Sequence, residues 1–313
     1  MKNSISMNEI GIGLKLSGRI NNDKDIKRLN AETPKRKPFN ISSKKIKAIL
    51  IRTAVYFCAA VTIFCILFML GYILVKGIPF LTRELFSLTY TSENCSVVPA
   101  MINTLTMTML SLLIACPLGI GSAIYLVEYS RKGNRFVKLV RMTAETLTGI
   151  PSIIYGLFGM LLFTGFLKWG YSLMAGAATL AIMILPTIMR TTEESLLAIP
   201  DSFREGSLGL GAGKLRTIFK IVLPSATPGI LSGIILATGR VVGETAALIY
   251  TAGTVAQIPP NLFGSGRTLA IHMYVLSSEG LHTGQAFATA VVLLIVVGAI
   301  NSLAAVLAKK ISK

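Results

Sequence analysis

Long apolar segments alternate with short polar connections along this chain of 313 residues. A helix that crosses a membrane needs roughly 20 mostly apolar residues. Six segments meet this length, and they cover residues 49–75, 100–127, 149–167, 171–189, 225–253 and 284–307. The pattern therefore predicts an all-α polytopic membrane protein with six transmembrane helices.

The Lys and Arg residues are distributed very unevenly around these six segments. With the N-terminus inside, the inner parts of the chain hold 26 of the 31 basic residues, the outer connections hold 4, and Arg240 lies within the fifth segment. Because Lys and Arg accumulate on the cytoplasmic side of membrane proteins, we expect both termini in the cytoplasm. The same asymmetry predicts that the chain crosses the membrane six times.

The composition points to the same class of protein. Hydrophobic residues make up 52% of the chain and charged residues 14%, whereas a soluble domain carries about 25% charged residues. The net charge of +17 raises the alternative of nucleic-acid binding, but the basic residues cluster beside apolar segments without interleaved aromatic residues. We therefore expect membrane lipid, and no nucleic acid, as a partner.

The first 47 residues are polar, with 12 Lys or Arg and 4 Asp or Glu. They lack the short apolar core of a signal peptide. We interpret residues 1–47 as a basic cytoplasmic N-terminal tail that helps to orient the protein, with binding to anionic lipid as the alternative. Residues 48–313 form the expected transmembrane domain.

The sequence offers no catalytic or metal-binding constellation. Three of the four cysteines lie in apolar segments, and Cys95 lies alone in an outer connection, where the sequence assigns it no role. His272 and His282 are too few and too far apart for a metal motif. We expect no catalytic residue, metal or cofactor in this chain.

The inner connection over residues 190–224 has a definite pattern. Pro200 ends the preceding helix, and Ser202-Phe-Arg-Glu205 matches a capping box at the start of the next one. Glycines at 209, 211 and 213 predict where that helix stops. We expect a short helix over about 203–210, followed by an amphipathic piece that leads to Pro224.

Part of this connection looks like a phosphate-binding loop, but it fails the pattern. Leu208 stands where the loop needs a glycine, and Leu215 follows Lys214 where Ser or Thr would bind magnesium. Any energy-consuming function therefore requires an ATPase in another subunit.

Two charged residues lie in the fifth apolar segment. Arg240 and Glu244 have a spacing of i, i+4, which places them on one side of a continuous helix. Charges within a membrane span usually face a partner or a pathway. Two interpretations remain open: a self-neutralising structural pair, or an anion route lined by Arg240, with Glu244 holding it and limiting overly tight anion binding.

The fifth segment also carries two pairs of closely spaced glycines. Gly229 and Gly233 form one pair, and Gly239 and Gly243 form the other. Such pairs allow close approach of helices in a membrane, either as routine packing or as part of a larger protein bundle.

The inner connection resembles the EAA loop of permease subunits in ABC importers. The motif is Glu205-Gly-Ser-x-x-x-Gly211, then nine residues, then Ile221-x-Leu223-Pro224, with Gly206 and Ser207 where the family has two alanines. The resemblance implies a type I ABC importer permease fold and a coupling loop at about 200–224 that docks on a cytoplasmic ATPase. The implied coupling residues are Glu205, Gly206, Ser207, Gly211, Leu223 and Pro224.

Further segments are similar to the PstA-type permease of the bacterial phosphate importer, over roughly residues 50–310. They are 123–129, 149–156 and 239–248, together with Ile258-Pro-Pro. The resemblance implies a location in the bacterial cytoplasmic membrane. It also implies import of phosphate by a complex with a PstC-type permease subunit, a PstB-type ATPase dimer and an external PstS-type phosphate-binding protein. In that complex residues 48–313 would be the permease domain.

Two alternatives to phosphate import remain open. The same architecture could import another anion or small solute. A non-transporting membrane scaffold or sensor could use the same loop to recruit a partner.

Overall fold

The computed structural model describes residues 41–131 and 133–311, and all regular elements within these ranges are helices. The chain divides into two compact units, Met1–Ile66 and Leu67–Lys313. The expected basic tail over 1–47 lies almost entirely outside the described residues. In the first unit, the described part is the start of helix α3, which covers Ile41–Gly77.

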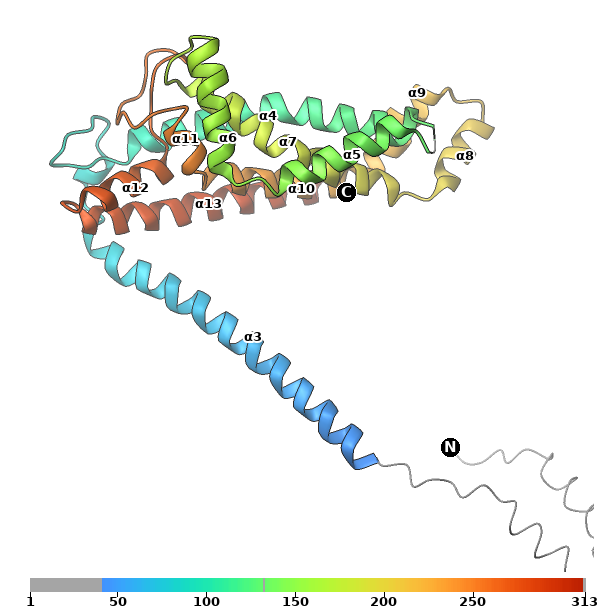
Figure 1. Cartoon of the computed structure of the whole chain (residues 1–313), viewed down its shortest axis with the longest axis horizontal. Helices are drawn as coiled ribbons and strands as arrows, with labels where there is room; N and C mark the ends of the chain where they lie inside the picture. The colour runs from blue at the N-terminus through green and yellow to red at the C-terminus, as the bar shows by residue number, and fades with distance from the viewer. Residues whose placement is uncertain (1–40, 132, 312–313) are drawn as a thin grey trace, which may run out of the picture. The chain divides into compact units, whose positions relative to one another are not determined.

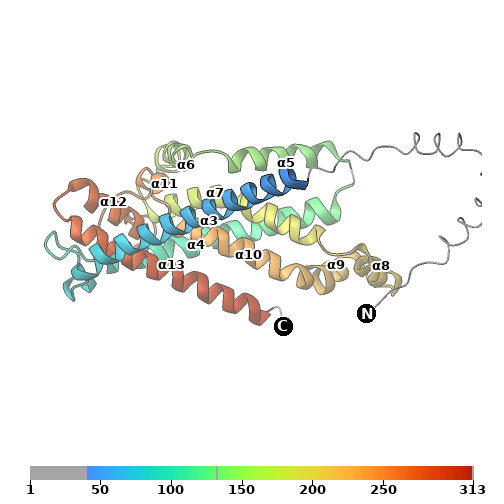
Figure 2. The same cartoon turned by 90° about the horizontal axis from the view of Figure 1, so that it is seen from below.

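The second unit is a bundle of long helices. It contains α4 (Val98–Ile124), α7 (Leu173–Leu197), α10 (Leu223–Val242) and α13 (Thr283–Ile311), which run side by side (Figures 1 and 2). The final residues of α3 join this unit, where the Tyr72 ring meets the edge of Phe287 on α13 with 5.7 Å between ring centroids.

The core of the bundle lies where α4, α7 and α10 meet. Met107, Ile184 and Val241 are buried there with side chains from all three helices. Lipid solvates apolar side chains as well as the protein does, so close packing between helices, rather than exclusion of water, stabilises such a core. α4 and α7 both continue through an internal proline, because neighbouring helices satisfy the freed carbonyls.

One of the two glycine pairs brings helices close together. A side chain added at Gly229 or Gly233 of α10 would collide with Ser195 or Thr191 of α7. By contrast, a side chain at Gly239 would meet only the Asn301 side chain, at 3.9 Å. The first pair therefore packs α10 against α7, whereas the second makes no comparable contact with another helix.

The third span is a bent pair rather than one straight helix. Amphipathic helix α5 (Arg135–Thr148) is followed by α6 (Ser152–Gly159) and the π-helical segment η4 (Met160–Phe166) at an angle of 103°. Five helices of the described chain are long and apolar enough to cross a membrane, and this bent pair makes a sixth. The six-span, all-α prediction is confirmed, although the third span is a bent pair that begins at Arg135 rather than one helix over 149–167.

The fifth span departs from its predicted course. The sequence predicted one segment over 225–253, but α10 ends at Val242 and a new short helix, α11, covers Ala246–Ile249. The prediction of a continuous helix is therefore wrong at residues 243–245. The break, Gly243-Glu244-Thr245, holds no apolar residue, but apolar residues resume at Ala246, so an average over about 20 residues merges the two helices into one segment.

The short elements gather at the two ends of the bundle. At one end lie α8 (Asp201–Gly209), α9 (Lys214–Thr217) and the π-helical η5 (Ile218–Val222), which leads into α10 (Figure 1). At the opposite end lie α11, α12 (Leu269–Glu279) and the 3₁₀ turns η1 (Ile78–Phe80) and η2 (Glu84–Phe86). Helix α12 lies in the connection between the fifth and sixth predicted spans.

Candidate functional site

Helix α8 is the element that the sequence motif singled out, and the structure shows how it is bounded. Pro200 occupies its N-cap position with no side-chain hydrogen bond to the helix, so the predicted capping box of Ser202 and Glu205 is wrong. Asp201 lies in the first turn, where a negative charge complements the helix dipole. After Gly209, Gly211 adopts a φ of +82°, a left-handed conformation that suits glycine.

α8 turns several apolar side chains away from the bundle. Phe203 and Leu208 are half exposed, and Leu210, just beyond the helix, is 91% exposed. Glu205 and Gly206 are exposed on the same helix. Exposed apolar side chains around a carboxylate are typical of a surface that binds another protein.

Ser207 points in the opposite direction. It is buried, and its hydroxyl lies 2.9 Å from the hydroxyl of Thr217 on α9. The hydrogen bond ties α8 to α9 across the glycine-rich turn. Of the six predicted coupling residues, Ser207 therefore serves the inside of this region rather than its exposed surface.

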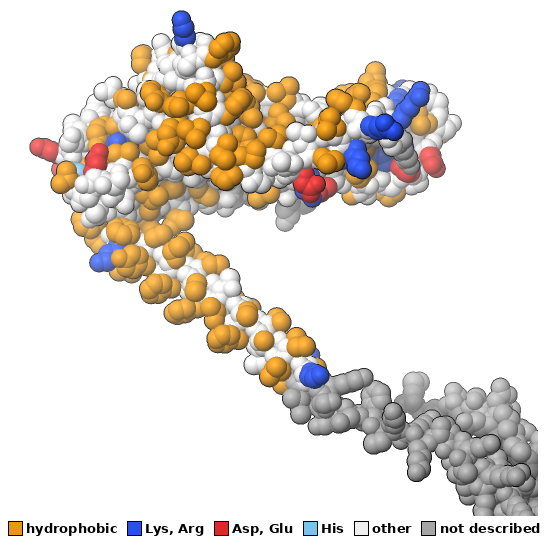
Figure 3. Space-filling model, in the orientation of Figure 1, with side chains coloured by type: hydrophobic (Ala, Val, Ile, Leu, Met, Phe, Trp, Pro, Cys, Tyr) orange, Lys and Arg blue, Asp and Glu red, His pale blue; other side chains and the backbone are white. Residues whose placement is uncertain are grey.

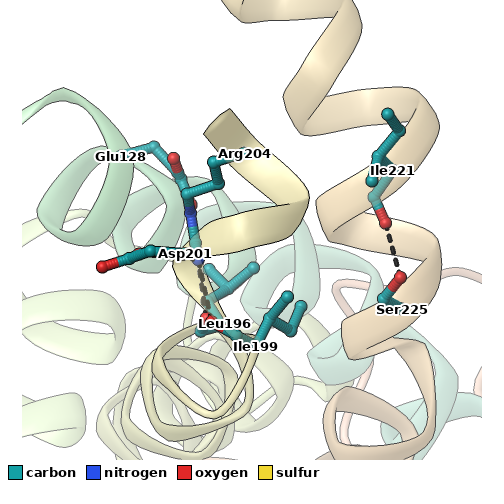
Figure 4. Close-up of polar contacts among 7 residues, drawn as sticks. All are labelled: Glu128, Leu196, Ile199, Asp201, Arg204, Ile221 and Ser225. Atoms are coloured by element: carbon teal, nitrogen blue, oxygen red, sulfur yellow. Dashed lines mark hydrogen bonds and ion pairs between the residues drawn. The ribbon is translucent and has the colours of Figure 1, made fainter. Parts of the chain in front are cut away.

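The last two predicted coupling residues lie apart from α8, at the start of α10. Leu223 is half-buried beside the cluster that contains Val222 and Ala226, and Pro224 is exposed. In the next turn the Ser225 hydroxyl donates a 2.7 Å hydrogen bond to the Ile221 carbonyl (Figure 4). These residues join the amphipathic segment after α8 to the spanning part of α10.

Arg204 holds α8 on the bundle, and the sequence analysis did not identify it. Its Nε and Nη2 atoms donate to Glu128 Oε1 at 3.0 and 2.8 Å, and Figure 4 shows the two side chains pointing toward each other. Nη2 and Nη1 also donate to the carbonyls of Leu196 and Ile199, each at 2.9 Å. A further contact of 3.3 Å joins Nη1 to Asp201.

These five contacts match the five N–H donors of a guanidinium. Glu128 belongs to the π-helical segment η3 (Tyr125–Tyr129), which continues α4. The Leu196 and Ile199 carbonyls lie at the end of α7, where the helix leaves acceptors without partners of its own. Arg204 thereby connects α8 to the ends of α4 and α7.

A second contact attaches the same region to η3. The ammonium of Lys214, at the start of α9, lies 4.7 Å from the centre of the Tyr129 ring. This distance is within the range of a cation–π interaction. Glu128 and Tyr129 are neighbours in the chain, so both attachments reach the same turn of η3.

Basic side chains are concentrated at this end of the second unit. Figure 3 shows Lys and Arg gathered near α9 and the nearby end of α5, whereas the flank of the bundle is largely hydrophobic. An ion pair of 2.5 Å between Arg141 on α5 and Glu193 on α7 lies in the same region. The charge pattern agrees with the sequence prediction that this end faces the cytoplasm.

The structure separates the other two predicted site residues. Arg240 is in the last turn of α10, whereas Glu244 lies in the break beyond the helix end. Glu244 is buried, and its Oε1 accepts a 3.1 Å hydrogen bond from the Ala247 amide of α11. No ion pair or hydrogen bond joins Arg240 to Glu244 in the described part of the chain, so the expected helical pair is wrong.

The break is packed against α6. A side chain at Gly156 would come within 2.7 Å of the Ala247 Cα, so the two backbones approach closely. The neighbouring Tyr155 is buried, donates a 2.7 Å hydrogen bond to the Leu147 carbonyl, and lies within electrostatic range of Arg240. The break therefore places the Arg240 side chain close in sequence to the non-helical backbone of residues 243–245.

A buried polar cluster lies at the opposite end from α8. Arg267 stacks over the Tyr90 ring at 4.6 Å, and the His272 ring meets the edge of Tyr90 with 5.9 Å between centroids. His272 Nε2 donates a 3.2 Å hydrogen bond to the Cys95 carbonyl. Burial is the main factor that lowers the pKa of His272 from 6.5 to about 3, and the charge of Arg267 lowers it further.

Cys95 also belongs to this cluster. Its thiol is buried, and burial raises the pKa of Cys95 above its usual value, although the charge of Arg267 acts in the opposite direction. Its backbone adopts a φ of +45°, which is uncommon for a residue other than glycine. This arrangement could not be predicted from the sequence, because Cys95 precedes α4 whereas Arg267 and His272 follow α11.

The fold defines a multi-span membrane protein with a short exposed helix, α8, between two of its spans. The chain belongs to the family of binding-protein-dependent transport system inner membrane components, whose family model matches residues 115–313, and within that family it is of the PstA type. The multi-pass prediction is confirmed by this membership and by the apolar helices.

Curated relatives cover much of the chain. A probable ABC transporter permease protein of Bacillus subtilis, YqgI, is 32% identical over 72% of this chain and 81% of its own length. The phosphate transport system permease protein PstA of Xylella fastidiosa is 32% identical over 77% of this chain and 90% of its own length. PstA 1 of Mycobacterium tuberculosis is 37% identical over 66% of this chain and 69% of its own length.

Solved structures share the fold. The crystal structure of a bacterial ABC transporter that imports alginate has a TM-score of 0.63 at 18% identity, covering 86% of this chain and 100% of the matched chain. An inward-facing structure of the MetNI methionine ABC transporter has a TM-score of 0.60 at 22% identity, covering 69% of this chain and 96% of the matched chain. The predicted type I importer permease fold is therefore confirmed.

Proposed function

We propose that this chain is one permease subunit of an ATP-driven phosphate importer and forms half of its translocation pathway. The observation that carries the proposal is α8, which presents Glu205 among exposed apolar side chains while Arg204 fixes the helix to the bundle. The choice of phosphate rests on the PstA relatives. The chain itself hydrolyses no ATP in this proposal.

α8 is the element that receives energy from the ATPase. Glu205, Gly206 and Gly211 are exposed where a partner can reach them, and the absence of side chains at the two glycines permits close approach of a partner. Ser207 supports α8 from inside through Thr217. Leu223 and Pro224 connect the loop to α10, and so transmit its position to the fifth span.

Arg240 is the residue that we place along the anion route. Discontinuous helices often form binding sites in membrane transporters, because their ends and unwound backbone face the cargo. Arg240 lies beside such a break, and Glu244 is engaged with α11. Glu244 therefore acts by fixing the shape of the break, and its negative charge nearby limits how tightly an anion is held.

The complete importer requires three further components. We propose a PstC-type permease subunit as the other half of the pathway, a PstB-type ATPase dimer at α8, and a PstS-type phosphate-binding protein at the opposite end. Both termini lie in the cytoplasm in this arrangement. Closure of the ATPase dimer would move α8 and rock the spans, giving alternating access.

ATP hydrolysis by the reconstituted complex tests this function. In liposomes that contain all components, phosphate with its binding protein should stimulate hydrolysis, whereas sulfate or an amino acid should not. Stimulation by another solute and not by phosphate would assign the chain to a different importer. Hydrolysis that responds to no solute would instead favour a scaffold or sensor.

A further inference from the structure

A largely buried ion pair connects α8 to η3. Arg204 is mostly buried and Glu128 is 8% exposed at its side chain, so their ion pair is largely removed from solvent. Breaking a buried pair leaves an uncompensated charge, which is strongly unfavourable. The two residues are therefore expected to move together when α8 is displaced.

The segment that receives this contact is itself unusual. Tyr125–Tyr129 forms a π-helical turn at the end of α4. Such turns are rare and frequently occur at functional sites. Here the turn presents Glu128 to Arg204 and Tyr129 to Lys214, so one short segment bears both attachments from the α8–α9 region.

We infer that Arg204 and Glu128 are a positioning pair that transmits the movement of α8 to α4. The inference rests on the proposed function, because it requires an ATPase that moves α8. It adds a specific route: from α8 through Arg204 to η3, and from there along α4, which packs on α7 and α10 across the main core. Leu223 and Pro224 provide a separate connection through α10.

Arg204 suits this role because its hydrogen bonds reach two different helices of the bundle. The bonds to the Leu196 and Ile199 carbonyls attach α8 to the end of α7, whereas the bonds to Glu128 attach it to α4. The contact with Asp201 stays within α8, and the Asp201 side chain is 74% exposed. A substitution at Glu128 can therefore weaken the link to α4 while the bonds from Arg204 to the end of α7 stay in place.

The decisive comparison uses Glu128→Gln, Arg204→Lys and the double variant, with Asp201→Asn as the matched control. Each is assembled with the partner permease and the ATPase in liposomes. Glu128→Gln removes the charge at nearly constant size, and Arg204→Lys keeps a charge but cannot form the forked contact. Assembly, basal ATP hydrolysis, solute-stimulated hydrolysis and solute transported per ATP are measured.

We expect both single variants to assemble and to keep basal hydrolysis, while solute transported per ATP falls about tenfold, a typical size for coupling between distant sites. The double variant should be no worse than the more severe single variant, because both changes break one link. Asp201→Asn should behave as the unsubstituted protein.

Normal transport per ATP in both single variants would overturn the inference. The inference would also be overturned if the fold-loss of transport per ATP in the double variant equalled the product of the two single fold-losses. The two residues would then act independently. Poor assembly with normal transport per ATP in the assembled fraction would assign the pair a purely structural role and also overturn it. The proposed function fails separately, if the unsubstituted complex shows no solute-stimulated hydrolysis.

Discussion

Arg240 is a charged residue in the last turn of a largely apolar spanning helix, and the chain continues beyond it into a second short helix, α11. A membrane span tolerates such a charge mainly where it faces a partner or a pathway. In this structure Glu244, the nearest carboxylate in the sequence, is turned toward the α11 amides. We therefore propose the Arg240 guanidinium as the group that meets an anionic cargo.

Replacement of Arg240 should strongly reduce phosphate uptake while the protein still folds and assembles. We expect Arg240→Ala to reduce uptake more than about tenfold, which corresponds to roughly 1.4 kcal/mol in the barrier, and Arg240→Lys to retain part of it. Uptake by the assembled complex, normalised to the amount of complex, measures the effect. Normal uptake in Arg240→Ala would show that Arg240 does not line the route.

His272 predicts a specific dependence of stability on pH. Its pKa is about 3 when folded and about 6.5 when unfolded, so both states are neutral above pH 6.5 and stability is highest there. As the pH falls from 6.5 toward 3, the unfolded state binds a proton that the folded state does not. Stability should then decrease by up to about 1.4 kcal/mol per pH unit.

Melting temperatures in detergent between pH 7 and pH 4 test this behaviour. His272→Gln lacks the titrating group, so its melting temperature should depend less steeply on pH than that of the unsubstituted protein. Identical slopes for the two proteins would mean that other groups cause the pH dependence.

At the scale of elements, the exposed side of α8 should carry binding energy for the ATPase. Leu210 is almost fully exposed, so Leu210→Ser should leave the fold intact but weaken ATPase binding by about 1–2 kcal/mol, the range of a substantial interface residue. Pull-down of the ATPase at several concentrations measures this change. Ser202→Ala is the control, because Ser202 makes no capping bond; equal affinity of all three proteins would exclude Leu210 from the interface.

The close contact between α6 and α11 should make the stability of the protein sensitive to any side chain added at Gly156. Gly156→Ala places a methyl group 2.7 Å from the Ala247 Cα, and backbone cannot move aside as a side chain can. We expect a loss of about 1–3 kcal/mol from overpacking, seen as a lower melting temperature. Gly121→Ala on α4 meets nothing within 4 Å and should not destabilise the protein; similar losses in both variants would contradict the argument.

The sequence predicted those elements whose signal is local. Six spans follow from hydropathy over about 20 residues, and the short helix at α8 follows from Pro200 and the glycines at 209 and 211. The capping box failed because the helix begins at Asp201, with Pro200 as its N-cap, two residues earlier than the pattern assumed. The break after Val242 contains no proline, and the polar run Gly243-Glu244-Thr245 is too short to divide an apolar segment when hydropathy is averaged over about 20 residues.

Contacts between distant parts of the chain could not be predicted in this way. Arg204 and Glu128 are 76 positions apart, and no spacing rule connects a loop residue to the end of another span. The same holds for Cys95 and His272, which are 177 positions apart. Glu205 was identified from its motif, whereas its neighbour Arg204 became visible only through its five contacts.

At the scale of the whole molecule, three structural features lie in separate parts of the second unit. α8 and α9 lie at one end with the basic residues, the buried cluster of Arg267 and His272 lies at the other, and the broken fifth span lies between α10 and α11. This arrangement fits a subunit that receives energy at one end and cargo at the other. α4, α7 and α10 connect the two through a shared core.

The most direct test of this account is ATP-dependent accumulation of radiolabelled phosphate in liposomes. They should contain this chain, its partner permease and the ATPase, with phosphate-binding protein and phosphate supplied at the side opposite the ATPase. The account predicts phosphate movement toward the ATPase side against its gradient, lost when ATP is omitted and in Arg240→Ala. No ATP-dependent phosphate movement by a correctly assembled complex would contradict it.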